Sequence, residues 1–285
     1  MSFATALTFL LLQIGPNPNA GAIPGIPDEL LNRPERRTNE IAPPEPTNPT
    51  SIWLSDCLDL VDSDPARAHT MAQIRRNATL GAERVIANHC LGLAATNLEL
   101  WTDAQTAFTA ARDETPAEEQ RARARFGAMA GNAALVSGNT ENAVALLLTA
   151  ENDAQGAQAG SLESIAATDR ARALVTLERP QEAVSALERA AQLTPDRGEI
   201  WLYKATLHRR LSQLTDAQTA IERAAELAPE DLQVGLEAGV IAVLSGRDDA
   251  ARASWQSVVD LAPTSAEAET ARAYLDQIGP AIPAE

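Results

Sequence analysis

Small, bulky and polar residues follow one another in a fixed order in the second half of this chain, and the order returns every 34 residues. Prolines at positions 195, 229 and 263 mark the period. Twelve, eight and five residues before the proline at 229 lie Ala217, Ile221 and Ala224, and the units on either side keep the same spacing. Offsets of four and three residues place side chains on one helix face. The pattern predicts an amphipathic helix that ends at each proline.

A preceding helix is predicted in each unit, because a small residue lies where the two helices would cross. These small residues are Gly92, Gly131, Ala171, Ala205 and Gly239. A small residue lets two helix backbones approach closely, and a bulky side chain of the second helix fills the space beside it. The segment TDAQ, at residues 102–105 and 215–218, indicates a capping box at the start of the second helix. Stacked helix pairs with a fixed period are typical of a solenoid.

In these features the sequence resembles the tetratricopeptide repeat family. The segments HCLGLAATNLELWTDAQTAFTAARDETP and WLYKATLHRRLSQLTDAQTAIERAAELAP carry the resemblance. It implies an all-α fold, a right-handed superhelical solenoid of antiparallel helix pairs. Five units fit the pattern, at residues 85–118, 124–157, 164–197, 198–231 and 232–265. The first two are followed by 5 and 6 extra residues, and unit 124–157 lacks the proline.

Shorter helical patterns flank the five units. Residues 51–84 are predicted to form a degenerate N-terminal repeat or cap, in which Asp64 caps a helix that begins at Pro65. Residues 266–285 are predicted to be a capping helix and tail, with a Thr-x-x-Glu capping box that starts at Thr264. Such a helix would cover the last repeat and turn its polar side to water.

The N-terminus reads as a targeting segment followed by a linker. Residues 2–14 are apolar and uncharged, which is shorter than the about 20 residues that a membrane span needs. Small residues at 20–22 suit a cleavage site, so residues 1–22 are predicted to be a signal peptide, although no Lys or Arg precedes the apolar run. The alternative is a short anchor in the inner membrane. Residues 23–50 are proline-rich and are predicted to be a disordered linker.

Composition narrows the class of partner. The formal charge is −16, which disfavours nucleic acid and anionic membranes as partners, because both need clustered cations. Lys204 is the only lysine beside 22 arginines, which we interpret as the codon bias of a GC-rich bacterium. Together with the predicted signal peptide, this indicates a periplasmic protein. Because exported proteins meet an oxidising environment, Cys57 and Cys90 are predicted to form a disulfide. The alternative is two buried free thiols.

No catalytic motif is found in the sequence. His89 precedes Cys90, but no further ligands follow at the spacing of a zinc site. No phosphate-binding loop or nucleophile elbow is present. We therefore expect no enzymatic activity, no metal and no cofactor. The alternatives are a helical accessory domain of an enzyme and a self-associating structural protein of the cell envelope.

The resemblance implies a scaffold that binds a peptide or partner protein in a concave groove, without indicating which partner. In the family, fixed positions of each first helix tend to line that groove. Counted along this chain, these positions are His89, Leu93, Asn97, Ala128, Asn132, Thr168, Arg172, Thr176, Leu202, Thr206, Arg209, Arg210, Leu236 and Val240. Asn side chains are expected to bind the peptide backbone, and Leu side chains its apolar residues. Arg172, Arg209 and Arg210 are expected to anchor an acidic partner, unless nearby acids neutralise them.

Overall fold

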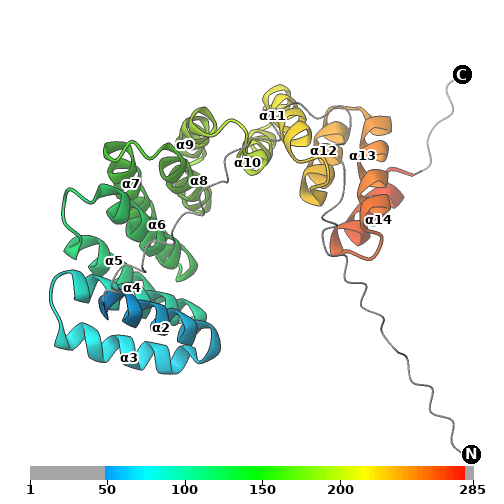
Figure 1. Cartoon of the computed structure of the whole chain (residues 1–285). Coiled ribbons are helices and arrows are strands. Elements are labelled where there is room, and N and C mark those ends of the chain that lie inside the picture. The colour runs from blue at the N-terminus through cyan, green and yellow to red at the C-terminus, as the bar shows by residue number, and fades with distance from the viewer. Residues whose placement is uncertain (1–48, 280–285) are drawn as a thin grey trace, which may run out of the picture. The chain divides into compact units, whose positions relative to one another are not determined.

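The computed structural model describes residues 49–279, and side chains from Ile52 onward. The predicted signal peptide, most of the predicted linker and the last six residues lie outside this range. Within it, helices follow one another with short turns and no strand is found (Figure 1). The helices are α2 (Pro49–Ser63), α3 (Pro65–Ala78), α4 (Ala82–Asn97), α5 (Trp101–Glu114), α6 (Gln120–Val136), α7 (Thr140–Gly156), α8 (Gly160–Thr176), α9 (Pro180–Leu193), α10 (Gly198–Arg210), α11 (Leu214–Leu227), α12 (Leu232–Leu244), α13 (Asp248–Leu261) and α14 (Ala266–Ile278).

Each predicted unit corresponds to one antiparallel helix pair. The pairs are α4–α5, α6–α7, α8–α9, α10–α11 and α12–α13, with α2–α3 before them and α14 after them. Every helix packs on its neighbours in the chain, both within a pair and from the second helix of one pair to the first helix of the next. These residues therefore form the all-α solenoid that the sequence predicts. No helix in the described range is long and apolar enough to cross a membrane.

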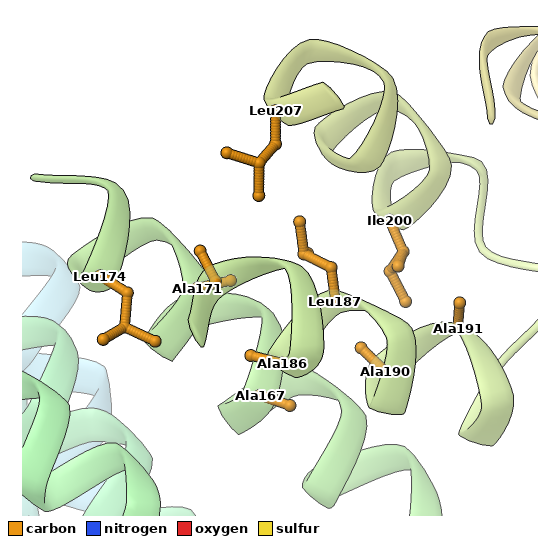
Figure 2. Packing of buried hydrophobic residues seen from close by; sticks show 10 residues of the cluster. Ala167, Ala171, Leu174, Ala186, Leu187, Ala190, Ala191, Ile200 and Leu207 are labelled. Carbon is orange, nitrogen blue, oxygen red and sulfur yellow. The ribbon is translucent and has the colours of Figure 1, made fainter. Parts of the chain in front are cut away.

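The predicted helix crossings are confirmed. A Cβ added to Gly92 would overlap the Phe108 ring, and one added to Gly239 would overlap Trp255. In α8 the small residue at the crossing is alanine: Ala171 lies in one buried cluster with Leu187 of α9. Figure 2 shows Leu187 pointing toward α10, from which Ile200 and Leu207 point back, so this cluster joins one pair to the next.

The turn between the two helices of a pair contains one residue in the left-handed conformation. Its φ angle is +58° at Glu99, +57° at Glu178 and +61° at Ser212, and glycine takes the place at 138 and 246. The next amide donates back across the helix end, as from Gln213 to the His208 carbonyl oxygen at 2.9 Å. This is the Schellman arrangement, which satisfies carbonyl groups that a helix end leaves open.

The predicted capping boxes at TDAQ are wrong, because these turns start the second helix earlier. Helix α5 begins at Trp101 and α11 at Leu214, so Thr102 and Thr215 are the second residues of their helices. Neither helix has a side-chain hydrogen bond at its N-cap. The backbone geometry of the Schellman turn, and not a threonine side chain, determines where these helices begin.

The helices at the ends differ slightly from the predicted ones. Asp64 caps α3 as predicted, accepting a hydrogen bond of 3.1 Å from the Arg67 amide. Helix α2 begins at Pro49, two residues into the predicted linker, because proline is tolerated in the first turn of a helix. The cap of α14 is Ser265, whose side chain accepts from the Ala268 amide, and not Thr264.

The extra residues of the first two units lengthen helices instead of loops. Helices α6, α7 and α8 have 17 residues each, whereas α9 to α14 have 13 or 14. Charged side chains link these helices: Arg112 of α5 lies 2.8 Å from Asp153 of α7, and Arg170 of α8 makes two hydrogen bonds to Glu151 of α7. Glu163, in the added turn of α8, pairs with Arg189 of α9 at 2.7 Å.

The two cysteines lie at the N-terminal end of the solenoid. Cys57 of α2 and Cys90 of α4 are both fully buried, and their Cα atoms are 6.3 Å apart. This spacing lies within the range of native disulfides. The predicted bond would join the cap pair to the first clear repeat.

Candidate functional site

The residues predicted to line the groove lie on the first helices of the five pairs. These helices lie side by side. Helix α6 contacts α8, α10 contacts α12 and α12 contacts α14, while His89 and Phe126 link α4 to α6, and α8 and α10 line one cleft. Toward the C-terminal end their surface is hollowed by two adjoining clefts.

The larger cleft, of about 740 Å³, lies across α10, α12 and α14. Five of the predicted groove residues line it: Leu202, Thr206, Arg209, Leu236 and Val240. The sequence reasoning missed Tyr203 and Glu237, which lie beside the family positions, and Tyr274 of the capping helix. The apolar part of the lining is aliphatic and aromatic. Glu199, Gln233 and Ala266 are exposed, and the other lining residues are half-buried.

The larger cleft carries a net negative charge. Glu199, Glu237 and Glu267 line it together with a single cation, Arg209. Arg209 is already paired, since its Nε donates to Glu237 Oε1 at 2.6 Å. Tyr203 donates to Glu199 at 3.1 Å, and burial, followed by the Glu199 charge, raises the pKa of the Tyr203 hydroxyl. The charge of Arg209, one of the predicted anchors for an acidic partner, is thus already paired with Glu237.

The smaller cleft, of about 210 Å³, lies between α8 and α10 above Leu187 of α9. Apolar side chains form most of its lining: Ala171, Val175, Leu187 and Leu207. Arg172 and Arg210, both predicted anchors, also line it. The Arg172 side chain is 52% exposed and lies 3.2 Å from Asp169, whereas Arg210 has no acidic partner within residues 52–279. Tyr203 and Thr206 line both clefts, so the two clefts adjoin at these side chains.

The predicted groove residues nearer the N-terminus line neither cleft. The amide nitrogen of Asn97 donates to the Val61 carbonyl at 3.3 Å, and that of Asn132 to Asp169 at 2.8 Å. Both donors that were expected to bind a peptide backbone are thus engaged within the chain. Thr168 is buried and donates to the Ser164 carbonyl at 2.8 Å. The remaining residues of this set are Leu93, Ala128 and the exposed Thr176.

His89 packs edge-on against Phe126 of α6, with the ring centroids 5.2 Å apart. Burial, followed by the positive charge of Arg125, lowers the pKa of His89. The imidazole is therefore held in its neutral form, as suits a packing role between α4 and α6.

Comparison with known proteins agrees with this architecture. Two family models described as tetratricopeptide repeat match residues 166–207 and 204–266. No curated protein matches the sequence.

Several solved structures share the fold at low sequence identity. PilW, described as a widely conserved type IV pilus biogenesis factor, has 16% identity and a TM-score of 0.61, over 78% of this chain and 97% of that one. PilF of Pseudomonas aeruginosa has 15% identity and a TM-score of 0.60, over 79% and 97%. YrrB, described as having an unusual peptide-binding site, has 18% identity and a TM-score of 0.50, over 66% and 92%. These likenesses concern the fold.

Repeats of this kind support a protein–protein interaction scaffold whose partner is a protein or peptide. The helix pairs with small-to-bulky crossings, the 34-residue period and the two matching family models agree, and residues 166–266 carry tetratricopeptide repeats.

Proposed function

We propose that this protein is a non-catalytic scaffold that binds an extended peptide segment of a partner protein in the cleft across α10, α12 and α14. The observation that carries the proposal is the composition of this cleft, in which Leu202, Leu236 and Val240 lie beside glutamates and hydroxyl groups. Apolar side chains with a few polar groups between them are what a bound peptide requires. The described residues leave this cleft open, whereas the helix crossings beneath it are closely packed.

The proposal includes the periplasm as the location. It is supported by the apolar N-terminal run and by the spacing of Cys57 and Cys90, which would allow a disulfide. A fusion of residues 1–50 to alkaline phosphatase, which becomes active only after export, tests the location. An inactive fusion that accumulates in the cytoplasm would contradict it.

A displayed library of random peptides tests the binding site. The variant is Thr270→Arg, which places a long side chain in the cleft from α14. The matched control is Thr219→Arg on α11. Both threonines donate their hydroxyl to the carbonyl four residues earlier, at 3.0 and 3.1 Å, and only Thr270 lines the cleft.

We expect peptides enriched on the wild type to be lost on Thr270→Arg and retained on Thr219→Arg. Circular dichroism shows whether both variants keep the fold. Peptides retained equally by all three proteins would place binding elsewhere, and no enrichment on the wild type would contradict the proposed function.

A further inference from the structure

We infer that the bound peptide is charged in a fixed order: it places an acidic side chain over the arginines between α8 and α10, a large apolar side chain in the cleft beneath them, and basic side chains over the cleft of α10, α12 and α14. This inference rests on the proposed function and adds the chemistry of the ligand.

The smaller cleft has the properties of an anchor site for one side chain. Its volume of about 210 Å³ is below the range of about 300–1,000 Å³ that is usual for small-molecule sites. Its lining by Val175, Leu187 and Leu207 is apolar, and it is open at the surface between two helices. A single large aliphatic side chain therefore matches both its size and its lining.

The two arginines beside this cleft give the charge of the neighbouring group. Arg172 comes from α8 and Arg210 from α10, so a ligand in the cleft would lie between two guanidinium groups. Of the two, only Arg172 has an acidic neighbour among residues 52–279: Asp169, which is also bound by Asn132. Guanidinium groups form charge-assisted hydrogen bonds with carboxylates. A carboxylate on the ligand would satisfy Arg210, which no described side chain does.

The charge changes sign along the same surface. Beyond Tyr203 and Thr206, which line both clefts, Glu199, Glu237 and Glu267 outnumber Arg209. Opposite charges on the ligand are favoured at each end, and like charges are costly. A peptide in the reverse order of charge is therefore disfavoured at both ends.

The geometry of an extended chain fixes the spacing. Side chains two residues apart point to the same side and are about 6.6–6.8 Å apart. An acidic residue two positions from the apolar anchor therefore lies on the protein side of the peptide. We assign the carboxylate to a side chain and not to the peptide C-terminus, because the face continues past Arg172 onto α6, which contacts α8.

Acetylated and amidated synthetic peptides of twelve residues provide the probe, measured by fluorescence anisotropy. The test peptide has Glu two positions before Leu and two Lys residues after it, in a Ser and Thr background. It is compared with its charge-exchanged form, with its Leu-to-Ala form, and with the reversed sequence, since an extended peptide can bind in either direction. We expect one direction to bind about tenfold or more tighter than its charge-exchanged form.

Charge reversal in the protein separates charge recognition from damage to the fold. The double variant Arg172→Glu, Arg210→Glu should lose most of the wild-type preference for the test peptide, because only the arginine end of the surface has changed sign. The matched control Arg67→Glu, Arg121→Glu makes the same change in net charge at exposed positions outside both clefts, and should keep the wild-type preference.

Each outcome decides a separate claim. Equal binding of the test and charge-exchanged peptides, or an unchanged preference in the Arg172→Glu, Arg210→Glu variant, overturns the charge order. Tighter binding of a peptide that ends in Leu with a free carboxylate overturns the assignment to a side chain. If library peptides bind the wild type and not Thr270→Arg, yet carry no charge order, this inference fails while the proposed function stands.

Discussion

The three helix pairs from α4 to α9 and the two pairs from α10 to α13 follow the same plan of crossings but differ in the charged contacts between their helices. In α4–α9, helices of up to 17 residues are joined by charged side chains with little exposure, such as Arg112 with Asp153 and Arg170 with Glu151. In α10–α13, helices of 13 or 14 residues keep the 34-residue period, and Arg209–Glu237 is the one ion pair between helices of these pairs among the described residues.

This difference shows how a repeat can depart from its period without losing the fold. An added helical turn leaves the small-to-bulky crossing in place, as at Gly131 and Leu147, but brings new charged residues beside a neighbour. In the lengthened pairs these paired charges are added to buried apolar clusters, which both parts of the solenoid contain. The two clefts both border α10, where the lengthened pairs meet the regular ones.

Removal of the predicted disulfide gives the largest expected effect and tests whether the N-terminal end is cross-linked. The substitutions Cys57→Ala and Cys90→Ala together should lower the free energy of unfolding of this end by about 3–4 kcal/mol, since the bond would close a loop across 33 residues. Denaturant unfolding of oxidised and reduced wild type is the control. Peptide mapping that finds both thiols free in periplasmic protein would contradict the bond.

Arg170→Ala tests whether charge pairing supports the lengthened pairs. It would leave Glu151, with a side chain only 10% exposed, without its partner. We expect a loss of about 2–3 kcal/mol in unfolding free energy, below the value for a fully buried pair. The control is Arg223→Ala, which breaks an exposed pair with Glu226 in α11 and should cost less than about 0.5 kcal/mol. Equal losses for both would remove the distinction between the two halves.

Ala217→Leu tests the packing at the crossing of α10 and α11, in the pairs that keep the 34-residue period. Ala217 is fully buried at the crossing of α10 and α11, so a larger side chain overpacks it and should cost about 1–3 kcal/mol. Ala225→Leu, at an exposed position of the same helix, is the matched control. A variant at 217 that melts like the wild type would mean that the crossing is assigned to the wrong residue.

Acidification through the range in which His89 titrates gives the smallest expected effect. The pKa of His89 is lowered from 6.5 in the fold, so the unfolded chain binds the proton first as the pH falls. Stability is therefore lost from about pH 6.5 downward and levels off below the folded pKa. His89→Gln should flatten this part of the pH profile of thermal unfolding. Arg125→Gln should reduce its slope, and an unchanged slope in both would exclude His89 as its source.

The parts of the fold that could be predicted from sequence are those determined within one unit. Gly92 and Phe108, or Gly239 and Trp255, are 16 residues apart, so their fit is visible as a repeated spacing. The start of α11 was mispredicted because the turn at Ser212 is a matter of backbone conformation, and serine gives little sign of a left-handed residue. The pairing of Arg170 with Glu151 depends on the phase of lengthened helices, which the 34-residue period does not contain.

The sequence predicted only those cleft residues that lie at the groove positions counted along the first helices of the repeats. Leu202, Leu236 and Val240 follow from counting along first helices, but Tyr274 belongs to a capping helix that the count does not reach. Whether a polar side chain is available depends on tertiary contacts. Asn132 is engaged because α6 and α8 bring Asp169 beside it, and no local pattern indicates this.

Three turn residues in the left-handed conformation are positions where substitution by glycine would raise the stability of the scaffold. Glu99, Glu178 and Ser212 adopt a conformation that costs about 1–2 kcal/mol for residues other than glycine, whereas glycine already occupies the equivalent places at 138 and 246. Because these turns lie outside both clefts, glycine there would raise the tolerance of the scaffold to substitution without altering the surface proposed to bind. Such a background would allow the clefts to be redesigned for new peptides.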